Sequence, residues 1–374
     1  MPKVSIIMPS LNVRPYIEEC MDSVVNQTLR DLEILCVDAG STDGTLEILR
    51  AYAQKDPRVK VIVSDRKSYG YQMNLGFDRA RGEYLGIVET DDFADPDMFE
   101  TLYNQAIQDD ADVVKGGFYY YWSAPEERDE PCPIASEIMC GRVFCPTTDF
   151  DSPMEQAEFF NIKPTIWSAV YKADFIRNND IRFHETPGAS FQDASFNFKV
   201  WTMARRVRLM QDCFLHYRQD NETSSINSPG KVFCVCDEYE EMERFLCAHP
   251  EKKGKMEGIR SRLKYDSYMW NFERLSEELQ DEFIVRASEE YNNDMRRGYI
   301  EPQYFPQYKW NTLILIMEDY RKFAADKRSG QLMTRNIPGG ALGQRIYSGM
   351  QCVKEHGFSY TVELGLLRLM GKEP

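Results

Sequence analysis

The sequence predicts an α/β protein with a mostly parallel central sheet, helices on both faces of that sheet, and an all-helical C-terminal region. Three observations lead to this fold class. Short apolar runs alternate with amphipathic stretches through residues 4–88. Each apolar run ends in a polar loop, as strands of a parallel sheet do. Strand-like runs then stop near Pro229, and only helical spacing follows.

The first strand is expected at residues 4–8, where Val4-Ser-Ile-Ile-Met8 is nearly all apolar. Pro15 suits the first position of the following helix. The same alternation continues along the chain. It predicts strands at 32–37, 59–63 and 83–88, and helices at 45–52, 69–80 and 98–108.

The pattern becomes less regular beyond residue 110. A strand is expected around Val113, and the aromatic run 118–122 is expected to be a strand or the wall of a pocket. Residues 123–150 are rich in Pro, Asp and Glu, which predicts a weakly structured insertion. The remaining elements are expected to be strands at 166–171, 207–210 and 214–217, a helix from 173, and a helix from Asp193 to Met203.

The composition change near residue 230 predicts two domains, at 1–230 and 231–374. The second is expected to be helical, with a role in acceptor, partner or membrane-surface contact, and it could support a homo-oligomer. Residues 364–370 could lie on a membrane surface, although packing on their own domain is the commoner outcome. Its helices are expected at 236–247, 256–275, 278–291, 312–323, 341–353 and 362–370.

Composition excludes some functions. The formal net charge of −15 argues against a nucleic-acid partner. No apolar segment approaches the length of a membrane span, and the first apolar run is too short for a signal peptide. The ten cysteines are scattered without zinc-site spacing, so we expect reduced thiols in a cytoplasmic protein that could contact the inner face of the membrane.

Acidic residues follow the fourth predicted strand. Glu89, Asp91 and Asp92 would repel one another unless a divalent cation such as Mg²⁺ or Mn²⁺ lay between them. A solvated acidic turn before the next helix is the alternative. The loops after the first four strands should meet at one edge of the sheet, where ligands of such folds bind. This convergence favours a cation-dependent site.

Six blocks of the chain resemble family 2 glycosyltransferases, which have the Rossmann-like nucleotide-diphospho-sugar transferase fold called GT-A. Val37-Asp-Ala-Gly-Ser-Thr-Asp-Gly44 is similar to the family's V-D-D-G-S-x-D-G, and Glu89-Thr-Asp-Asp92 is similar to its D-x-D-D. Gln192-Asp-Ala-Ser-Phe-Asn197 resembles E-D-x-x-F-N. The other blocks are at 4–12, 20–28, 70–76 and 82–84. The resemblance ends near residue 225.

The resemblance implies roles for particular residues. Asp193 would be the general base, Asp91 the surer cation ligand and Glu89 the second. Asp38 would contact a uracil-type base, and Asp92 would help position the donor sugar. His216 is a weaker metal candidate, more simply read as a strand histidine. The implied nucleotide and donor contacts are Pro9, Ser10, Asn12, Asp38, Gly40, Ser41, Asp43, Tyr69, Gly70, Asn74, Thr90 and Asp92.

The implied function is an inverting, metal-dependent glycosyltransferase that uses Mn²⁺ or Mg²⁺. Its donor would be a nucleotide sugar, with UDP-linked sugars expected first. Its acceptor would be a hydroxyl on a glycan, a lipid-linked carrier or another molecule, in bacterial surface polysaccharide or glycoconjugate assembly.

Three departures from the family pattern keep an alternative open. Ala39 replaces an Asp, Glu89 replaces the first metal-motif Asp, and Gln192 replaces the Glu before the base. The alternative is therefore a catalytically inert GT-A-fold subunit of a polysaccharide assembly system. A nucleotidyltransferase is disfavoured, because the loop after the first strand lacks the Gly-rich, basic pattern that holds a triphosphate.

Overall fold

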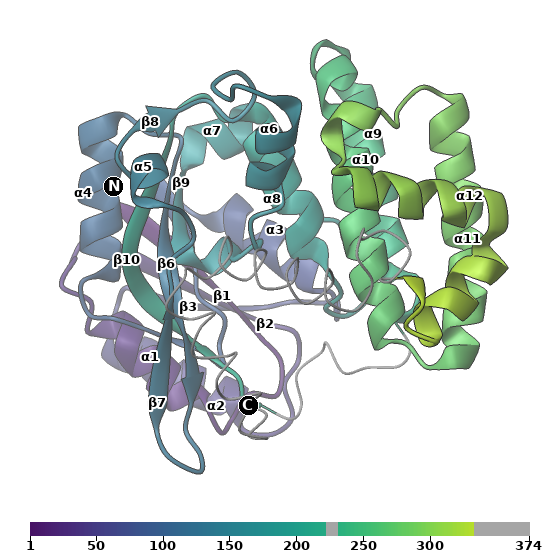
Figure 1. The fold of residues 1–374 in the computed structure, drawn as a ribbon. Coiled ribbons are helices and arrows are strands. Elements are labelled where there is room, and N and C mark those ends of the chain that lie inside the picture. Colours follow the sequence, from purple (N-terminus) through teal and green to yellow (C-terminus); the bar gives the residue numbers. More distant parts are fainter. Residues whose placement is uncertain (222–230, 333–374) are drawn as a thin grey trace. The chain divides into compact units, whose positions relative to one another are not determined.

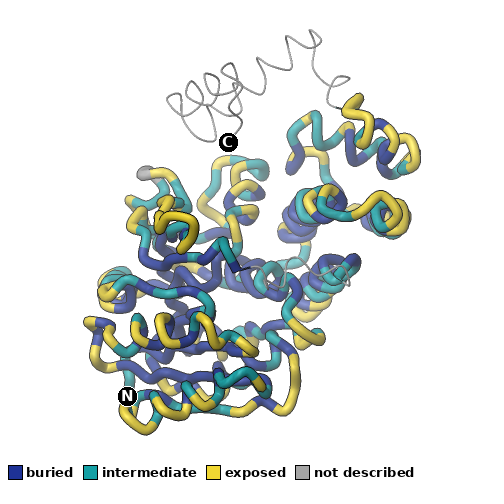
Figure 2. Tube along the Cα trace, turned by 90° about the horizontal axis from the view of Figure 1, so that it is seen from below, coloured by how far each residue is buried: buried dark blue, intermediate teal, exposed yellow. Residues whose placement is uncertain are grey.

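The computed structural model describes residues 1–221 and 231–332. The chain divides into two compact units, Met1–Asn271 and Phe272–Pro374, and each is described by itself. Figure 1 shows the arrangement of helices and strands within the first unit, and Figure 2 shows that its sheet is largely buried while exposed residues gather on helices and loops.

Within the described residues, the strands of the first unit form one sheet with the main order β3-β2-β1-β4-β9-β6-β10-β5. β1, β2, β3 and β4 run parallel, and β9 is antiparallel to both β4 and β6. The strands are β1 (Val4–Ser10), β2 (Leu32–Asp38), β3 (Val59–Val63), β4 (Tyr84–Ile87), β5 (Phe93–Ala94), β6 (Val113–Trp122), β7 (Arg128–Cys132), β8 (Val143–Phe144), β9 (Ala169–Lys172) and β10 (Val207–Arg218).

Helices cover both faces of this sheet, as the sequence predicted. In Figure 1, α1 and α4 lie on one side, and α3, α7 and α8 on the other. Close packing needs small residues: a Cβ on Gly76 of α3 would lie 2.6 Å from Ile7 of β1. The helices are α1 (Ile17–Val25), α2 (Thr45–Lys55), α3 (Tyr69–Arg79), α4 (Met98–Asp109), α5 (Glu137–Cys140), α6 (Pro153–Phe160), α7 (Ala173–Asn178) and α8 (Gln192–Met203).

The middle of the chain differs from the prediction. Residues 123–150, predicted to be a weakly structured insertion, contain β7, α5 and β8, and β7 pairs antiparallel with β6. The two runs around 113 and 118–122 form one strand, β6. The two runs predicted at 207–210 and 214–217 form β10, with a register shift between Leu209 and Cys213. Residues 166–171 begin as a 3₁₀ turn, Ile166–Ser168, before β9.

The C-terminal part is helical where the structure describes it. α9 (Cys234–Ala248) and most of α10 (Pro250–Arg274) belong to the first unit; α11 (Glu277–Arg296) and α12 (Gln307–Arg328) belong to the second. α12 is kinked at Asp319. The boundary between the two compact units thus lies about forty residues after residue 230. The division into domains at residue 230 stays a prediction. The helices expected at 341–353 and 362–370 lie outside the described residues.

In the described ranges 1–221 and 231–332, none of the helices has the length and apolar character that crossing a membrane requires.

Candidate active site

The loops that follow β1, β2 and β4 meet at one edge of the sheet. Ser10 and Asp38, the last residues of β1 and β2, are paired in register. The Thr90 hydroxyl donates a hydrogen bond to the Pro9 carbonyl at 2.8 Å, which joins the loop after β4 to β1. These contacts place Pro9, Ser10, Asp38 and Thr90 together, at the edge where a parallel sheet binds its ligands.

Asp38 holds the loop that follows β2. Its Oδ1 accepts hydrogen bonds from the backbone N–H groups of Gly40 and Ser41, each at 2.9 Å, and its Oδ2 accepts one from the Ser41 hydroxyl at 2.6 Å. Gly40 has a φ of +83°, a conformation that favours glycine. The Asp38 side chain is fully buried by these partners. In this structure its oxygens shape the loop, and its contact with a nucleotide base stays a prediction.

Asn12 and Asp43 connect the same two loops. The Asn12 N–H donates to Ser41 Oγ at 2.9 Å, and Asn12 Oδ1 accepts from the Thr42 N–H at 2.9 Å. Asp43 accepts from the N–H groups of Arg14 and Thr45, both at 3.0 Å. These polar residues form a stiff rim, and Asn12 itself remains exposed.

The three acidic residues after β4 have different surroundings. Glu89 Oε1 accepts from the Tyr69 hydroxyl at 2.5 Å, and Asp91 Oδ2 accepts from the Asn221 amide at 2.9 Å. Asp92 is 1% exposed; its Oδ1 accepts from the Arg218 N–H at 2.9 Å, and its Oδ2 has no hydrogen-bond partner among the described residues. Burial raises the pKa of Asp92, and the neighbouring charge of Asp91 raises it further.

Arg218 joins the end of β10 to this acidic loop. Its Nε donates to the Asp91 carbonyl at 3.0 Å, and its guanidinium pairs with Glu19. The same guanidinium lies over the rings of Tyr16 and Tyr121, 4.9 and 4.8 Å from their centroids. Arg218 therefore fixes the loop through both its backbone and its side chain.

His216 is not placed to bind a cation in this structure. Its Nδ1 lies 2.7 Å from Asp129 and its Nε2 lies 3.1 Å from Asp95, so both ring nitrogens already face carboxylates. The ring is stacked between Phe93 and Tyr119. Burial alone would lower the pKa of His216, but its hydrogen bonds to the two carboxylates raise it. The alternative reading, a strand histidine, describes this geometry better.

Asp193 lies in the first turn of α8, within electrostatic reach of the acidic loop. Its charge contributes to the raised pKa values of Glu89 and of Tyr69. Burial raises the pKa of Asp193 to about 6, and the nearby Glu238 carboxylate adds to the effect. Its Oδ1 accepts only a 3.0 Å hydrogen bond from the next residue, Ala194, and the side chain is partly exposed. A proton acceptor needs this combination of access and raised pKa.

Two residues predicted to contact the donor lie against the segment that leads to Asp193. The Asn74 amide donates to the Phe183 carbonyl and to Glu185, both at 3.0 Å, and its oxygen accepts from the Phe183 N–H at 2.9 Å. A Cβ on Gly70 would lie 2.0 Å from the carbonyl oxygen of His184. Asn74 is buried and its amide is used by this segment, so its contact with the donor stays a prediction.

Lys163 lies against an aromatic wall. Phe118 and Tyr120 of this wall belong to the run that was predicted to be a strand or the wall of a pocket, whereas Tyr217 and Lys163 were not singled out from the sequence. Lys163 lies 4.7–5.1 Å from the ring centroids of Phe118, Tyr120 and Tyr217. Burial lowers the pKa of Lys163, while the charges of Cys132, Asp193 and Asp92 oppose that change. The aromatic run at 118–122 was the only signal for this wall. Lys163 stands in no recognisable motif.

The cation that the sequence implies can be tested against these donors. No group of three His, Cys, Asp or Glu side chains in residues 1–221 and 231–332 is arranged to hold a metal ion alone. Mg²⁺ and Mn²⁺ sites that bind phosphates need only one or two carboxylates, because the substrate and water supply the rest. Asp91 and the unpartnered Oδ2 of Asp92 fit that lower requirement. Glu89 is already bonded to Tyr69, so it fits less well.

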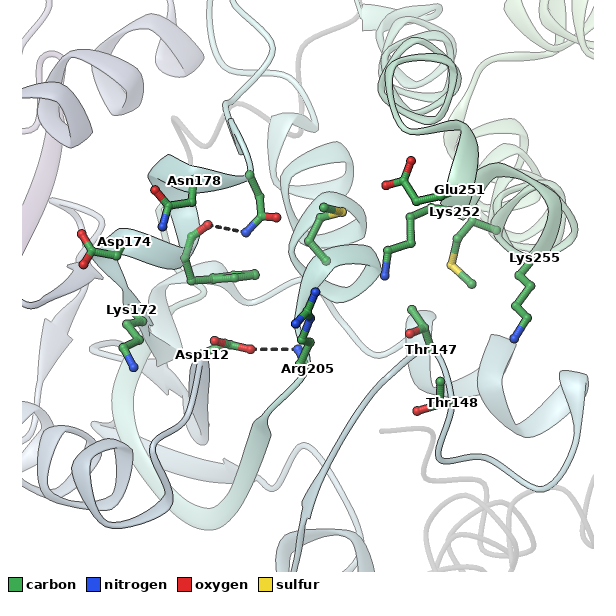
Figure 3. A pocket seen from close by; sticks show the side chains of 14 residues that line it. Asp112, Thr147, Thr148, Lys172, Asp174, Asn178, Arg205, Glu251, Lys252 and Lys255 are labelled. Carbon is green, nitrogen blue, oxygen red and sulfur yellow. Dashed lines mark hydrogen bonds between the residues drawn. The ribbon is translucent and has the colours of Figure 1, made fainter.

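A cavity of about 670 Å³ lies away from these residues (Figure 3). Asp112 and Arg205 on its wall precede β6 and β10, so the cavity is at the amino ends of these strands, the edge opposite to the carboxylates. Lys252 and Lys255 of α10 complete its rim. None of the site residues predicted from the sequence lines this cavity.

The fold and the edge of acidic loops define a GT-A protein, the class that the sequence predicted. TarS of S. aureus, solved as residues 1–349 in complex with UDP-GlcNAc, matches the structure with a TM-score of 0.68, over 88% of this chain and 92% of that one. The two sequences are 18% identical, so this likeness concerns the fold alone.

Residues 5–134 match the family model described as Glycosyl transferase family 2. EpsJ of Bacillus subtilis (strain 168), named an uncharacterized glycosyltransferase, is 32% identical over 236 residues, or 62% of this chain and 64% of EpsJ. GlyG of Streptococcus pneumoniae serotype 4 (strain ATCC BAA-334 / TIGR4), named a glycosyltransferase, is 41% identical over 119 residues, or 32% of this chain and 40% of GlyG. The matches thus span less than two thirds of the length of these curated relatives.

Proposed function

We propose that the protein is an inverting glycosyltransferase, which moves a sugar from a nucleoside-diphosphate donor to an acceptor hydroxyl with the help of Mn²⁺ or Mg²⁺. The observation that carries this proposal is the link that Tyr69 makes between the acidic loop and the segment before α8. Its hydroxyl donates to Glu89 at 2.5 Å, and its N–H donates to the Gly188 carbonyl at 2.9 Å, a few residues before Asp193. The match of residues 5–134 to the family 2 model supports the same reading.

In this proposal Asp193 removes the proton from the acceptor hydroxyl. The pKa of Asp193, raised to about 6 by burial and by Glu238, leaves it mostly ionised at neutral pH and a stronger base than an ordinary aspartate. The acceptor oxygen then forms its bond to the anomeric carbon as the bond to the diphosphate breaks. A single displacement of this kind inverts the anomeric centre, and it needs no nucleophile from the protein.

The diphosphate would lie beside the loop that Arg218 fixes. Asp91 and Asp92 would hold the divalent cation, which when bound stabilises the charge that develops on the leaving diphosphate. The rim formed by Ser10, Asn12 and Asp43 would border the nucleotide. UDP is the expected nucleotide, because the resemblance to family 2 implies a contact of Asp38 with a uracil-type base and the TarS structure contains UDP-GlcNAc.

The acceptor would approach along the aromatic wall. Aromatic rings favour sugar and other amphipathic surfaces, and Lys163 supplies a hydrogen-bond donor beside them. The acceptor class is a glycan, a lipid-linked carrier or another hydroxyl compound, in polysaccharide or glycoconjugate assembly. We place this reaction on the cytoplasmic side of the cell membrane, with contact to the membrane surface or self-association as roles for the C-terminal helices.

One observation favours a second candidate, a non-catalytic subunit. Glu89 is bonded to Tyr69, and burial raises the pKa of Glu89 to about 8, so this carboxyl is not an open cation ligand. A protein that kept the fold but lost donor turnover would have the same feature.

A donor screen separates the two candidates. Thermal shift with Mn²⁺ and a panel of nucleotide sugars identifies the donor, because a ligand that binds the folded state raises its stability. Hydrolysis of that donor is then measured for wild type, Asp91→Asn, Asp193→Asn and the exposed control Asp97→Asn. Loss of activity in the first two variants alone supports the enzyme. Donor binding without any turnover in wild type supports the inert subunit.

A further inference from the structure

The cavity at the amino ends of β6 and β10 has the dimensions and the lining of a ligand site. Its volume of about 670 Å³ falls within the range of about 300–1,000 Å³ that small-molecule sites occupy. Phe175, Met203 and Met256 make up the apolar part of its lining, and the hydroxyl-bearing Thr147 and Thr148 lie beside them. All of its lining residues belong to the compact unit Met1–Asn271, so the cavity lies within one unit.

Two cations meet in this cavity. Figure 3 shows that the guanidinium of Arg205, just before β10, and the ammonium of Lys252, in the first turn of α10, are directed toward the same space. Neither charged group has a hydrogen bond or an ion pair with a residue in the described ranges 1–221 and 231–332. Like charges that converge without a counter-ion repel one another, and the start of a helix further disfavours a lysine. The arrangement therefore favours an anion between them.

Other basic residues nearby have found partners. The Nε of Arg206 donates to the carbonyls of Asp109 and Asp110, both at 3.0 Å, and Arg208 pairs with Asp109 at 2.7 Å. Lys172, on the wall of the cavity, donates to Asp110 at 2.7 Å. The chain has 60 acidic and 45 basic residues, so carboxylates are plentiful. A shortage of acidic partners thus does not explain the two unpaired cations.

The carboxylates that line the cavity do not neutralise these two cations. Asp112 accepts hydrogen bonds from the backbone N–H groups of Arg205 and Arg206, at 2.8 and 3.1 Å, so it fixes the chain at Arg205 and leaves the guanidinium unpaired. The side chain of Asp174 is 82% exposed and points away from Arg205 in Figure 3. Glu251 is exposed at the start of α10. The space in front of the two cations is therefore open to a ligand.

We propose that this cavity is a second ligand site, in which Arg205 and Lys252 bind a phosphate group of a small molecule. A guanidinium offers a planar pair of donors that matches two phosphate oxygens, and an ammonium adds a compact charge. The hydroxyls of Thr147 and Thr148 can donate to the same group, and the apolar part of the lining would contact the rest of the molecule. This inference goes beyond the proposed function and does not depend on it.

The site is separate from the acidic edge. Arg205 precedes β10, whereas Arg218, which fixes the acidic loop, is the last residue of that strand. The 12 residues of β10 correspond to about 40 Å along the strand, at about 3.3 Å per residue. A nucleotide sugar bound at the acidic edge therefore does not account for the two cations.

The test is calorimetric titration of the whole chain with pyrophosphate, in EDTA and without a divalent cation. Wild type is compared with Arg205→Gln and Lys252→Gln, whose side chains have no described partner to lose, so thermal melts should show that both variants stay folded. Lys253→Gln removes an equal charge from the next residue of α10, which does not line the cavity, and is the matched control. Asp91→Asn reports on binding at the acidic edge.

We expect wild type to bind pyrophosphate with a dissociation constant below about 1 mM, and each of Arg205→Gln and Lys252→Gln to bind at least about tenfold more weakly. Lys253→Gln and Asp91→Asn should bind as wild type does. The inference is overturned if wild type does not bind pyrophosphate, if Arg205→Gln and Lys252→Gln bind it unchanged, or if Asp91→Asn loses the binding, which would place the anion at the acidic edge.

A second arm identifies the source of the phosphate. The protein is sedimented with vesicles of phosphatidylglycerol and, for comparison, of phosphatidylcholine. Sedimentation with phosphatidylglycerol alone, abolished by pyrophosphate and by Lys252→Gln, would support a lipid headgroup as the ligand. Pyrophosphate binding without sedimentation would support a soluble phosphate compound at the same two cations.

Discussion

The hydroxyl of Tyr69 lies 2.5 Å from Oε1 of Glu89, which fastens the first turn of α3 to the acidic loop after β4. The backbone N–H of Tyr69 also donates to the Gly188 carbonyl at 2.9 Å. One residue thus connects the two segments that carry the candidate cation ligands and the candidate base. The geometry of the site depends on this connection.

Replacing Tyr69 by Phe should therefore weaken both the fold and the site. Without the Tyr69 hydroxyl the partly buried Glu89 carboxyl loses this hydrogen bond, which costs about 1–3 kcal/mol in the free energy of unfolding. We expect a lower melting temperature and weaker donor binding, measured by calorimetry. Tyr71→Phe, on the same helix, is the control and should change neither. Identical behaviour of the two variants would show that the Tyr69 hydroxyl does not hold the loop.

Gly70→Ala should be destabilising because its Cβ would lie 2.0 Å from the backbone oxygen of His184. Relieving this overlap requires a backbone shift, which costs about 1–3 kcal/mol. Gly254→Ala in α10 is the matched control: nothing lies within 4 Å of its Cβ, and alanine in a helix gains about 0.5–1 kcal/mol over glycine. Chemical denaturation should move the two variants in opposite directions, and a neutral Gly70→Ala would contradict the close packing of α3.

Glu33 should make stability depend on acid pH. Burial alone would raise its pKa, but hydrogen bonds from Lys60, Ser5 and Arg81 lower it from 4.5 to about 2. Because the folded pKa is depressed, this carboxylate stabilises the fold above pH 4.5, and the contribution is lost as pH falls toward 2. We expect about 2–3 kcal/mol, since a shift of one unit is about 1.4 kcal/mol and the partners are partly exposed.

The measurement for Glu33 is the free energy of unfolding between pH 2.5 and pH 6. The Glu33→Gln variant should lose most of the pH dependence in the acid part of this window, whereas Glu47→Gln, an exposed control on α2, should keep it. Equal slopes for wild type and Glu33→Gln would rule out this contribution.

Much of the fold could be predicted from the sequence because its first half is regular. Nearly continuous apolar runs such as Val4 to Met8 are typical of strands buried on both faces, and their alternation with amphipathic helices leaves few topologies. The sequence did not predict that residues 113–122 form one strand, β6, because this depends on contacts with β10. Gly116 and Gly117 interrupt the apolar pattern of β6 because a Cβ there would lie 2.8 and 2.7 Å from Phe214 and Cys213 of β10.

Candidate site residues could be predicted where they stand in a sequence motif. Residues outside any motif, which only the fold brings near the site, could not. The acidic loop and Asp193 lie in sequence motifs, Glu89-Thr-Asp-Asp92 and Gln192-Asp-Ala-Ser-Phe-Asn197. Glu238 is one of several glutamates on an amphipathic helix, and Lys163 is one lysine in an irregular segment, so only the folded chain brings them to Asp193. Asn74 shows the converse, since its motif is clear but its amide is used by Phe183 and Glu185.

Asp193→Asn should reduce sugar transfer by about 10²–10⁴-fold, the usual contribution of a general base, while leaving donor binding unchanged. In wild type the rate should fall as pH drops below about 6, because burial and Glu238 raise the pKa of Asp193 to that value and protonation removes the base. The pH profile of kcat/KM measures this. A profile that stays flat between pH 5 and pH 7 would exclude Asp193 as the base.

The most direct test of the central claim is calorimetric binding of UDP and of GDP, each with and without Mn²⁺, to wild type and to Asp91→Asn. We predict that one nucleotide binds wild type, that Mn²⁺ strengthens this binding at least tenfold, and that Asp91→Asn loses the Mn²⁺-dependent part while Asp97→Asn retains it. Equal, Mn²⁺-independent affinities in wild type and Asp91→Asn would contradict a cation-bridged diphosphate at this edge of the sheet.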